Sequence, residues 1–187
     1  MNTSHSEFPG IGLLAVDLQP VFIDIMPEPT KLFKRAEFAL QSAQLLEIPI
    51  FLTEQTPDKL GPTHPELLKR LNPKPRLFTK DHFSALEAPG IIETLENESI
   101  EHLIICGLEL SICLYQSVLS AHQAGLGVTV LTDAVASRRA GDAAPIYRAL
   151  ERSGATLLPS ETVFYSMLKT AKHPKFRAFL EIVKAYS

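Results

Sequence analysis

The chain has 187 residues, 45% of them hydrophobic and 21% charged, which is the composition of one globular domain with a full core. Its formal net charge of −3 gives no support for a nucleic acid or an anionic membrane as partner. No apolar run approaches the roughly 20 residues that span a bilayer, and the first residues lack the basic and apolar regions of a signal peptide. We therefore expect a single domain over residues 1–187, in the cytoplasm, with no nucleic-acid or membrane partner.

Apolar runs typical of buried strands alternate with segments that carry apolar residues at helical spacing. The predicted strands cover residues 11–16, 48–53, 76–79, 103–106, 128–131 and 155–158. Helices are predicted at residues 31–46, 90–97, 112–124 and 142–153, and two more begin near residues 160 and 173. Residues 56–65 hold three prolines and a glycine, which predicts a loop. This alternation predicts an α/β fold with a mostly parallel sheet of about six strands, covered on both faces.

Several polar side chains follow the predicted strands. Asp17, Glu54 with Gln55, and Lys80 each lie at the end of a strand, and the turn that leads to Cys113 follows another. Ligands bind at the carboxyl ends of parallel strands, so an acid, an ammonium and a thiol could meet in one crevice there. Taken one at a time, Asp17 and Lys80 can each be explained by a structural role. An Asp at a strand end is often a turn former or a helix cap, and a Lys there is often a solvated edge charge.

Cys113 is the candidate nucleophile. It follows an apolar strand that ends at Gly107, and it lies at the start of a predicted helix, where backbone N–H groups and the helix dipole favour negative charge. This position predicts a thiol pKa lowered from about 8.5 toward neutrality, and amides that can stabilise an oxyanion. The alternative is a small buried hydrophobic residue. Cys106, at the end of the strand, is expected to be inert packing.

Three segments, in this order, resemble the isochorismatase-like cysteine hydrolase superfamily. They are residues 14–19 with Phe22, residues 80–84, and residues 106–113 running on to 133–138. Within the superfamily the chain is most similar to the isochorismatase domain-containing group, because of residues 53–67 and 171–176. The resemblance extends over nearly the whole chain and implies a three-layer α/β/α, Rossmann-like fold.

The resemblance also implies a catalytic triad, in which Asp17 is the acid, Lys80 the electrostatic partner and Cys113 the nucleophile. The family pattern places a non-proline cis peptide at Leu108–Glu109, which turns the Glu109 N–H toward the substrate. With the Cys113 N–H it would form an oxyanion hole. The implied reaction is attack of the thiolate on a carbonyl or related carbon, loss of ammonia or an amine, and hydrolysis of the thioester.

Further residues near the predicted strand ends are candidates for binding the substrate. These are Gln19, Phe22, Glu54, Gln55 and Leu108. Phe22 is equally suited to the core. Glu54 and Gln55 are equally suited to capping, or to hydrogen bonding the proline-rich loop that follows them.

The sequence predicts neither a metal nor a cofactor. Nicotinamidases of this superfamily carry an Asp/His metal cluster between the first two triad residues, whereas this region offers only His64, which is expected to be a solvated loop residue. His82 is not needed as a base because the triad already contains an acid. Asp133 is expected to make a structural hydrogen bond. Isochorismatases proper cleave a vinyl ether without a cysteine nucleophile, so Cys113 argues against that reaction.

Together these residues predict a metal-independent cysteine hydrolase that cleaves a small amide or related C–N bond. One alternative is a non-catalytic binding or scaffold protein that retains the fold. Another is a thiol redox function, although Cys106 and Cys113 lie too far apart for a Cys-X-X-Cys motif. The expected partners are a small-molecule substrate and further copies of the chain. The superfamily commonly forms dimers or larger assemblies, and the apolar stripe of the C-terminal helix could serve such a contact or pack within the chain.

Overall fold

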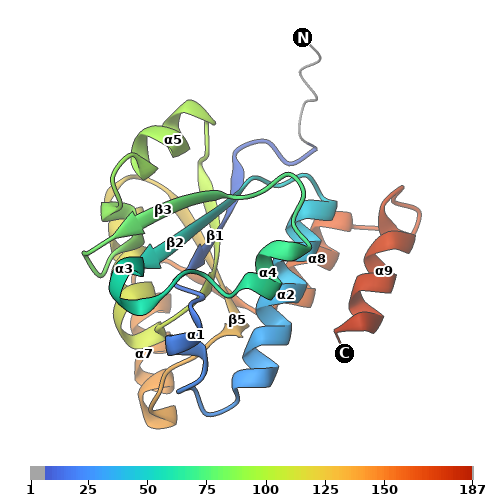
Figure 1. The fold of residues 1–187 in the computed structure, drawn as a ribbon. Helices are drawn as coiled ribbons and strands as arrows, with labels where there is room; N and C mark the ends of the chain where they lie inside the picture. Colours follow the sequence, from blue (N-terminus) through green and yellow to red (C-terminus); the bar gives the residue numbers. More distant parts are fainter. Residues whose placement is uncertain (1–6, 187) are drawn as a thin grey trace.

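The computed structural model describes residues 7–186, which form a six-stranded sheet between two layers of helices (Figure 1). All neighbouring strands are parallel, in the order β3-β2-β1-β4-β5-β6. The strands are β1 (Ile11–Val16), β2 (Ile50–Gln55), β3 (Arg76–Lys80), β4 (His102–Gly107), β5 (Gly127–Val135) and β6 (Thr156–Leu158). The longer helices are α2 (Pro29–Leu45), α5 (Ile91–Asn97), α6 (Tyr115–Gln123), α7 (Ala140–Arg152), α8 (Ser160–Leu168) and α9 (Phe176–Ala185). The predicted α/β class is confirmed.

The central strand β1 is buried on both faces, as its continuous apolar run predicts. Leu13 and Ala15 belong to the core layer that contains the apolar residues of α2, α8 and α9. Leu14 and Val16 belong to the opposite layer, with the apolar residues of α5, α6 and α7. Successive side chains of one strand therefore pack against both helical layers, which produces the three-layer α/β/α arrangement.

Three phenylalanines form the centre of the first layer. Phe38 of α2, Phe164 of α8 and Phe179 of α9 are fully buried, and their ring centroids lie 5.9–6.4 Å apart. Pairs of aromatic rings at this separation stabilise a core by about 0.5–1.5 kcal/mol beyond the apolar area that they bury. The C-terminal helix therefore packs within the chain, on α2 and α8, through Phe179.

Two local predictions were wrong. The predicted loop at residues 56–65 contains the helix α3 (Pro57–Leu60) and the start of α4 (Pro65–Lys69). A proline occupies the first position of each helix, where its missing N–H leaves no hydrogen bond unmade. The helix predicted from residue 112 is preceded by a π-helical turn, η2 (Leu110–Leu114), which leads into α6. Two further short helices, α1 (Pro20–Ile23) and η1 (Ala85–Glu87), follow β1 and β3.

The order of the strands reverses at the centre of the sheet. The chain proceeds from β1 outward to β2 and β3, then returns to β4 and continues to β5 and β6 on the other side. Such a reversal leaves a crevice at the carboxyl ends of the two central strands. Asp17 directly follows β1, and η2 follows β4, so the fold brings the acid and the thiol to this crevice. Among the described residues, no helix is both long and apolar enough to cross a membrane.

Gly107 allows the turn after β4 to lie directly against β1. Its φ is +113°, and a Cβ atom at this position would lie 2.1 Å from the carbonyl oxygen of Val16 and 2.6 Å from its nitrogen. The next amide, Leu108 N–H, donates a hydrogen bond to that same Val16 oxygen (2.8 Å). A side chain at position 107 would push apart the two strands that carry the candidate acid and thiol.

We predict that Gly107→Ala lowers the free energy of unfolding by about 3 kcal/mol or more, because the methyl group meets backbone that cannot rotate away. Urea unfolding followed by circular dichroism measures this change. Gly141→Ala is the matched control. No atom lies within 4 Å of its added Cβ, and the residue lies in the first turn of α7, so this variant should be at least as stable as the parent. Equal midpoints for Gly107→Ala and Gly141→Ala would contradict the steric argument.

Candidate active site

A small cleft opens at the carboxyl ends of β1 and β4, with a volume of about 140 Å³. It is lined by Asp17, Phe22, Ile25, Gln55, Phe83, Glu109, Ile112, Cys113 and Arg138. Five of these residues are among the site residues predicted from the sequence: Asp17, Phe22, Gln55, Glu109 and Cys113. Lys80, the remaining member of the predicted triad, contacts Asp17 from within the protein.

Lys80 and Asp17 form a buried ion pair. The side chains of both are excluded from solvent, and Lys80 Nζ lies 2.6 Å from Asp17 Oδ2. The ammonium also donates to Gln55 Oε1 (2.6 Å) and to the backbone oxygen of His82 (3.3 Å), so each of its three protons has an acceptor. The second carboxylate oxygen, Asp17 Oδ1, accepts a hydrogen bond from Thr53 Oγ1 (2.8 Å). Both charges are therefore paired and hydrogen bonded, as burial requires.

The Cys113 thiol is hydrogen bonded to the Asp17 carboxylate. Burial raises the pKa of Cys113 to about 11, and the negative charge of Asp17 adds to this effect. The Lys80 ammonium and a hydrogen bond from the Glu109 backbone act in the opposite direction but are weaker. Burial also raises the pKa of Asp17, against the lowering effect of Lys80. The resting thiol therefore keeps its proton and shares it with Asp17.

The prediction of a thiol pKa near neutrality was wrong, and its error has a physical cause. It treated Cys113 as a first-turn residue exposed to the helix dipole. In the structure Cys113 lies in the π-helical turn η2, is 7% exposed, and faces a carboxylate. Desolvation and a neighbouring negative charge outweigh the helix dipole, because a dipole effect falls off within one turn.

The backbone around Cys113 is anchored from two sides. The Leu110 N–H donates to the Ala136 oxygen (2.8 Å), which ties η2 to the end of β5. Ser117 Oγ donates to the Cys113 oxygen (2.6 Å) and accepts from the Ala85 N–H (2.7 Å), which ties η2 to η1. Just before η2, the peptide bond between Leu108 and Glu109 is cis, the bond that the family resemblance specifies.

Gln19 does not line the cleft, which corrects its prediction as a substrate-binding residue. Its side chain is fully buried, and Nε2 donates to the backbone oxygens of Gln55 (3.0 Å) and Gly61 (2.6 Å). Its Oε1 accepts from the Gln55 N–H (2.7 Å). Since every polar group of this amide is occupied by backbone, Gln19 fastens the segment after β2 to the segment after β1.

Glu54 and Leu108 are two further corrections. Glu54 is 3% exposed, and its Oε1 accepts a hydrogen bond from the Thr63 N–H (2.6 Å), so it holds the proline-rich segment rather than a substrate. Leu108 is fully buried in the core layer beneath α2. Gln55 does line the cleft, but its amide is engaged between the Lys80 ammonium and the Asp81 oxygen.

Four residues of the cleft were not assigned to the site from the sequence: Ile25, Phe83, Ile112 and Arg138. Ile25 and Phe83 are 52% and 56% exposed, which places apolar surface in solvent. Arg138 Nε lies 2.7 Å from Glu109 Oε2, so this cation is already paired. Phe83, Ile112 and Arg138 lie in segments that carried the family resemblance, and that was the signal for them.

Asp133 has the structural role predicted for it. The Ser160 N–H donates to its Oδ1 (2.8 Å), and Arg35 Nε donates to its Oδ2 (2.8 Å). Arg35 also pairs with Glu161 (3.3 Å). These bonds join α2, the end of β5 and the start of α8, and they leave Asp133 outside the cleft.

No group of three or more His, Cys, Asp or Glu side chains is placed to hold a metal ion among residues 7–186. His64 is the N-terminal cap of α4, where its Nδ1 accepts from the Glu66 N–H (3.3 Å), and its ring packs edge-on against Phe33. His64 was predicted to be a solvated loop residue, and in the structure it caps a helix instead.

The fold and this cleft define a Rossmann-like protein with a cysteine at the carboxyl ends of the two central strands, and comparison with known proteins identifies its family. A family model, the isochorismatase domain, matches residues 12–162, so the chain belongs to the isochorismatase family of hydrolases. It is 35% identical over 179 residues to isochorismatase domain-containing protein 2 of Xenopus laevis, covering 91% of this chain and 82% of that protein. The human protein of the same name is 32% identical over 179 residues, covering 94% and 84%.

Solved structures share the fold. A protein of Caenorhabditis elegans described as MAR1 ribonuclease superposes with a TM-score of 0.88 at 28% identity, covering 95% of this chain and 92% of that one. YcaC of Escherichia coli, described as an octameric hydrolase of unknown specificity, superposes with a TM-score of 0.82 at 19% identity, covering both chains completely. YcaC of Pseudomonas aeruginosa, solved with hexane-2,5-diol and covalent acrylamide, gives a TM-score of 0.87 at 21% identity, covering 99% and 96%. The three-layer fold is therefore that of the isochorismatase-like proteins.

We predict that iodoacetamide alkylates Cys113 slowly at pH 7, and that the rate rises about tenfold per pH unit up to pH 10, because only the thiolate reacts. Asp17→Asn removes a negative charge that raises the pKa of Cys113, so its pKa should fall and alkylation at pH 8 should become at least tenfold faster. Peptide mass spectrometry measures both rates. Cys106 is the internal control: burial raises its pKa to about 12, and it should stay unlabelled. A rate that levels off near pH 7 in the parent protein would show that a thiolate is already present.

Proposed function

We propose that this chain is a metal-independent cysteine hydrolase that cleaves a small amide or related C–N bond. Cys113 is the nucleophile, Asp17 the base, and Lys80 the electrostatic partner of Asp17. The observation that carries the proposal is the cleft that holds the Cys113 thiol together with a buried carboxylate, Asp17, which is itself paired at 2.6 Å with the buried Lys80 ammonium. A binding protein has no requirement for this chain of three groups.

The raised pKa of Cys113 determines the form of the attack. A thiol of pKa about 11 is almost wholly protonated at pH 7, so the Sγ–H proton must pass to Asp17 as the bond from Sγ to the carbonyl carbon forms. When the C–N bond breaks, Asp17 returns that proton to the leaving nitrogen. A water molecule then attacks the thioester and gives a proton to Asp17, and the departing sulfur recovers it. Each step uses Asp17 as the carrier of one proton.

Lys80 keeps Asp17 able to accept that proton. Burial alone would favour the neutral acid, and the Lys80 ammonium at 2.6 Å opposes this by stabilising the carboxylate. The Glu109 N–H already donates toward Cys113. It is well placed to donate to the oxyanion that forms beside the sulfur, and the Cys113 N–H is the second donor in this proposal.

The cleft favours a small and largely apolar acyl group. Its volume is about 140 Å³, well below the 300–1,000 Å³ typical of sites for drug-sized ligands. Four of its nine lining residues, Phe22, Ile25, Phe83 and Ile112, are large and apolar. An RNA strand, by contrast, is bound mainly through cations that contact its phosphates. Arg138 is the one cation that lines this cleft among the described residues, and Glu109 already neutralises it. The site thus favours a small amide over the RNA suggested by the name of the C. elegans structure.

The redox alternative is weakened by the positions of the two cysteines. Cys106 packs in the core layer beneath α2, whereas Cys113 packs in the opposite layer. The sheet separates the two thiols, and Cys106 is fully buried. A disulfide between them would require the central strands to open.

We also propose that the chain works as a homo-oligomer in the cytoplasm. The E. coli relative with this fold is octameric, which supports self-association. Val21, Ile25 and Phe83 are large apolar side chains, 41–56% exposed, and two of them lie on the rim of the cleft. A neighbouring subunit that covered this rim would also shield the cleft from water.

The proposal is tested with a panel of primary amides of short aliphatic and aromatic acids, by ammonia release and by intact-protein mass spectrometry. We expect an acyl adduct on Cys113 and no turnover by Cys113→Ala. Asp17→Asn should lower kcat/KM by at least about 100-fold, because general base catalysis contributes about 10²–10⁴. The same variant has the more easily alkylated thiol, so chemical reactivity and turnover should move in opposite directions.

Asp133→Asn is the matched control for this experiment, since Asp133 is also a carboxylate at the end of a strand but lies outside the cleft. It should lose stability and keep most of the kcat/KM. Full activity in Asp17→Asn, or hydrolysis by Cys113→Ala, would refute the assigned roles.

A further inference from the structure

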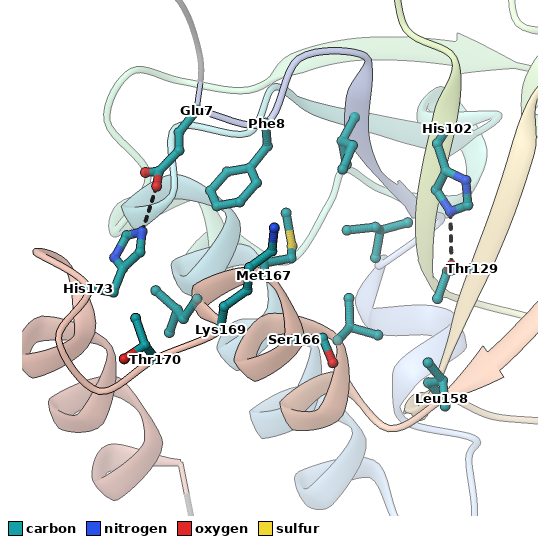
Figure 2. A pocket seen from close by; sticks show the side chains of 14 residues that line it. Glu7, Phe8, His102, Thr129, Leu158, Ser166, Met167, Lys169, Thr170 and His173 are labelled. Carbon is teal, nitrogen blue, oxygen red and sulfur yellow. Dashed lines mark hydrogen bonds and ion pairs between the residues drawn. The ribbon is translucent and has the colours of Figure 1, made fainter.

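A second and larger cavity lies at the opposite end of the strands from the cleft, where β1 and β4 begin (Figure 2). Its volume is about 670 Å³, against about 140 Å³ for the cleft at Cys113. Strand β1 separates the two, since Ile11 at its start lines this cavity and Asp17 beyond its end lines the cleft, roughly 20 Å away. The proposed hydrolase mechanism uses none of the residues around this cavity.

The cavity, called here the strand-start pocket, has an apolar wall formed by five parts of the chain. The apolar lining residues are Phe8, Ile11, Ile104, Leu158, Val163, Met167 and Leu168. They come from the segment before β1, from strands β1, β4 and β6, and from helix α8. A cavity of this size and lining falls within the range that small-molecule ligands occupy.

Most polar groups of the strand-start pocket are paired with one another. His102 Nε2 lies 2.8 Å from Thr129 Oγ1, and burial lowers the pKa of His102, so its ring is neutral at pH 7. His173 Nδ1 accepts the Lys175 N–H (3.1 Å), which leaves its Nε2 to carry the proton shared with Glu7 Oε1 (2.7 Å). Figure 2 shows Glu7 turned toward His173. These pairs hold the walls together. Because His173 is neutral with Nδ1 as an acceptor, the Glu7 carboxylate keeps its negative charge, which disfavours a ligand with more than one negative charge.

Lys169 is the exception. It lines the pocket, and Figure 2 shows its side chain reaching from the turn after α8 into the space that the lining residues surround. Its Nζ forms no hydrogen bond or ion pair with any residue in the range 7–186. The backbone here is unusual for a side-chain-bearing residue: φ is +59°, and the Thr170 N–H donates to the Leu168 oxygen (2.6 Å) across it. This is a γ-turn of the rare, strained type, at a helix end where glycine is common.

We propose that the strand-start pocket binds a small amphipathic carboxylate, with its head group on Lys169 and its apolar body on the wall formed by Ile104, Val163 and Met167. An ammonium that has no partner among residues 7–186, beside a large apolar surface, matches a ligand with one negative charge and a hydrocarbon or aromatic body. A phosphate is a poorer match, because its second charge would find no further free cation among the lining residues.

The first measurement uses 8-anilinonaphthalene-1-sulfonate, a fluorescent anion with an aromatic body, on the full chain. We expect saturable binding to one site per chain, displaced by octanoate. Lys169→Met keeps the length of the side chain and removes its charge, so octanoate should displace the probe at least fivefold less effectively. Displacement by 1-octanol, which has the same body and no charge, should be unchanged.

Two further variants locate the site. Lys172→Met is the matched control, since Lys172 is an exposed lysine of the same turn that does not line the pocket, and its binding should equal that of the parent. Ser166→Phe fills the pocket from the outer side of α8, where Ser166 is exposed, and should abolish binding of the probe without unfolding the chain. Alkylation of Cys113 should change neither result.

Several results would overturn the proposal. Unchanged binding in Ser166→Phe would place the probe elsewhere, for instance at the apolar rim of the cleft. Equal octanoate affinities in Lys169→Met and Lys172→Met would remove the role of Lys169. If the full chain bound no probe but did so after deletion of residues 2–6, the start of the chain would be the occupant. If binding appeared only on dissociation of an oligomer, measured by light scattering, a second copy would be the occupant.

Discussion

The buried ion pair between Asp17 and Lys80 is the interaction on which the rest of the site depends. Removing two charges from water costs several kcal/mol each, and the pair is stable only because both partners are present and fully hydrogen bonded. Its partners come from the ends of β1, β2 and β3, and the parallel register sets Val16 beside Thr53 and Gln55 beside Lys80. The three strand ends are thereby joined by charge as well as by backbone hydrogen bonds.

Much of the fold and the main site residues could be predicted from the sequence, because both follow from strand periodicity. Continuous apolar runs identify strands buried on both faces, and parallel strands bring their carboxyl ends to one edge. That reasoning allowed Asp17, Lys80 and Cys113 to meet in one crevice, and the family resemblance selected them as a triad. The structure places Asp17 and Cys113 in one cleft and Lys80 against Asp17.

The remaining features depend on contacts between distant segments, which periodicity does not report. Gln19 and Glu54 also lie at strand ends, but their side chains turn away from the cleft to bind Gly61 and Thr63 in the segment that returns over them. The pKa of Cys113 could not be deduced from its place near a helix start, because burial and the Asp17 charge arise from the tertiary structure. Arg138 enters the cleft only through the path of the chain after β5.

The separation of the two cysteines by the sheet has a consequence for damage by oxidants. The chain contains two cysteines, and they lie in opposite core layers, so a sulfenic acid formed on Cys113 finds no resolving thiol within its own chain. Repair would depend on an external thiol such as glutathione. That thiol would have to reach the sulfur in a cleft of about 140 Å³. The raised pKa of Cys113 compensates for this, because peroxide attacks thiolates far faster than thiols. Sharing its proton with Asp17 therefore leaves the sulfur protected until a substrate is in place.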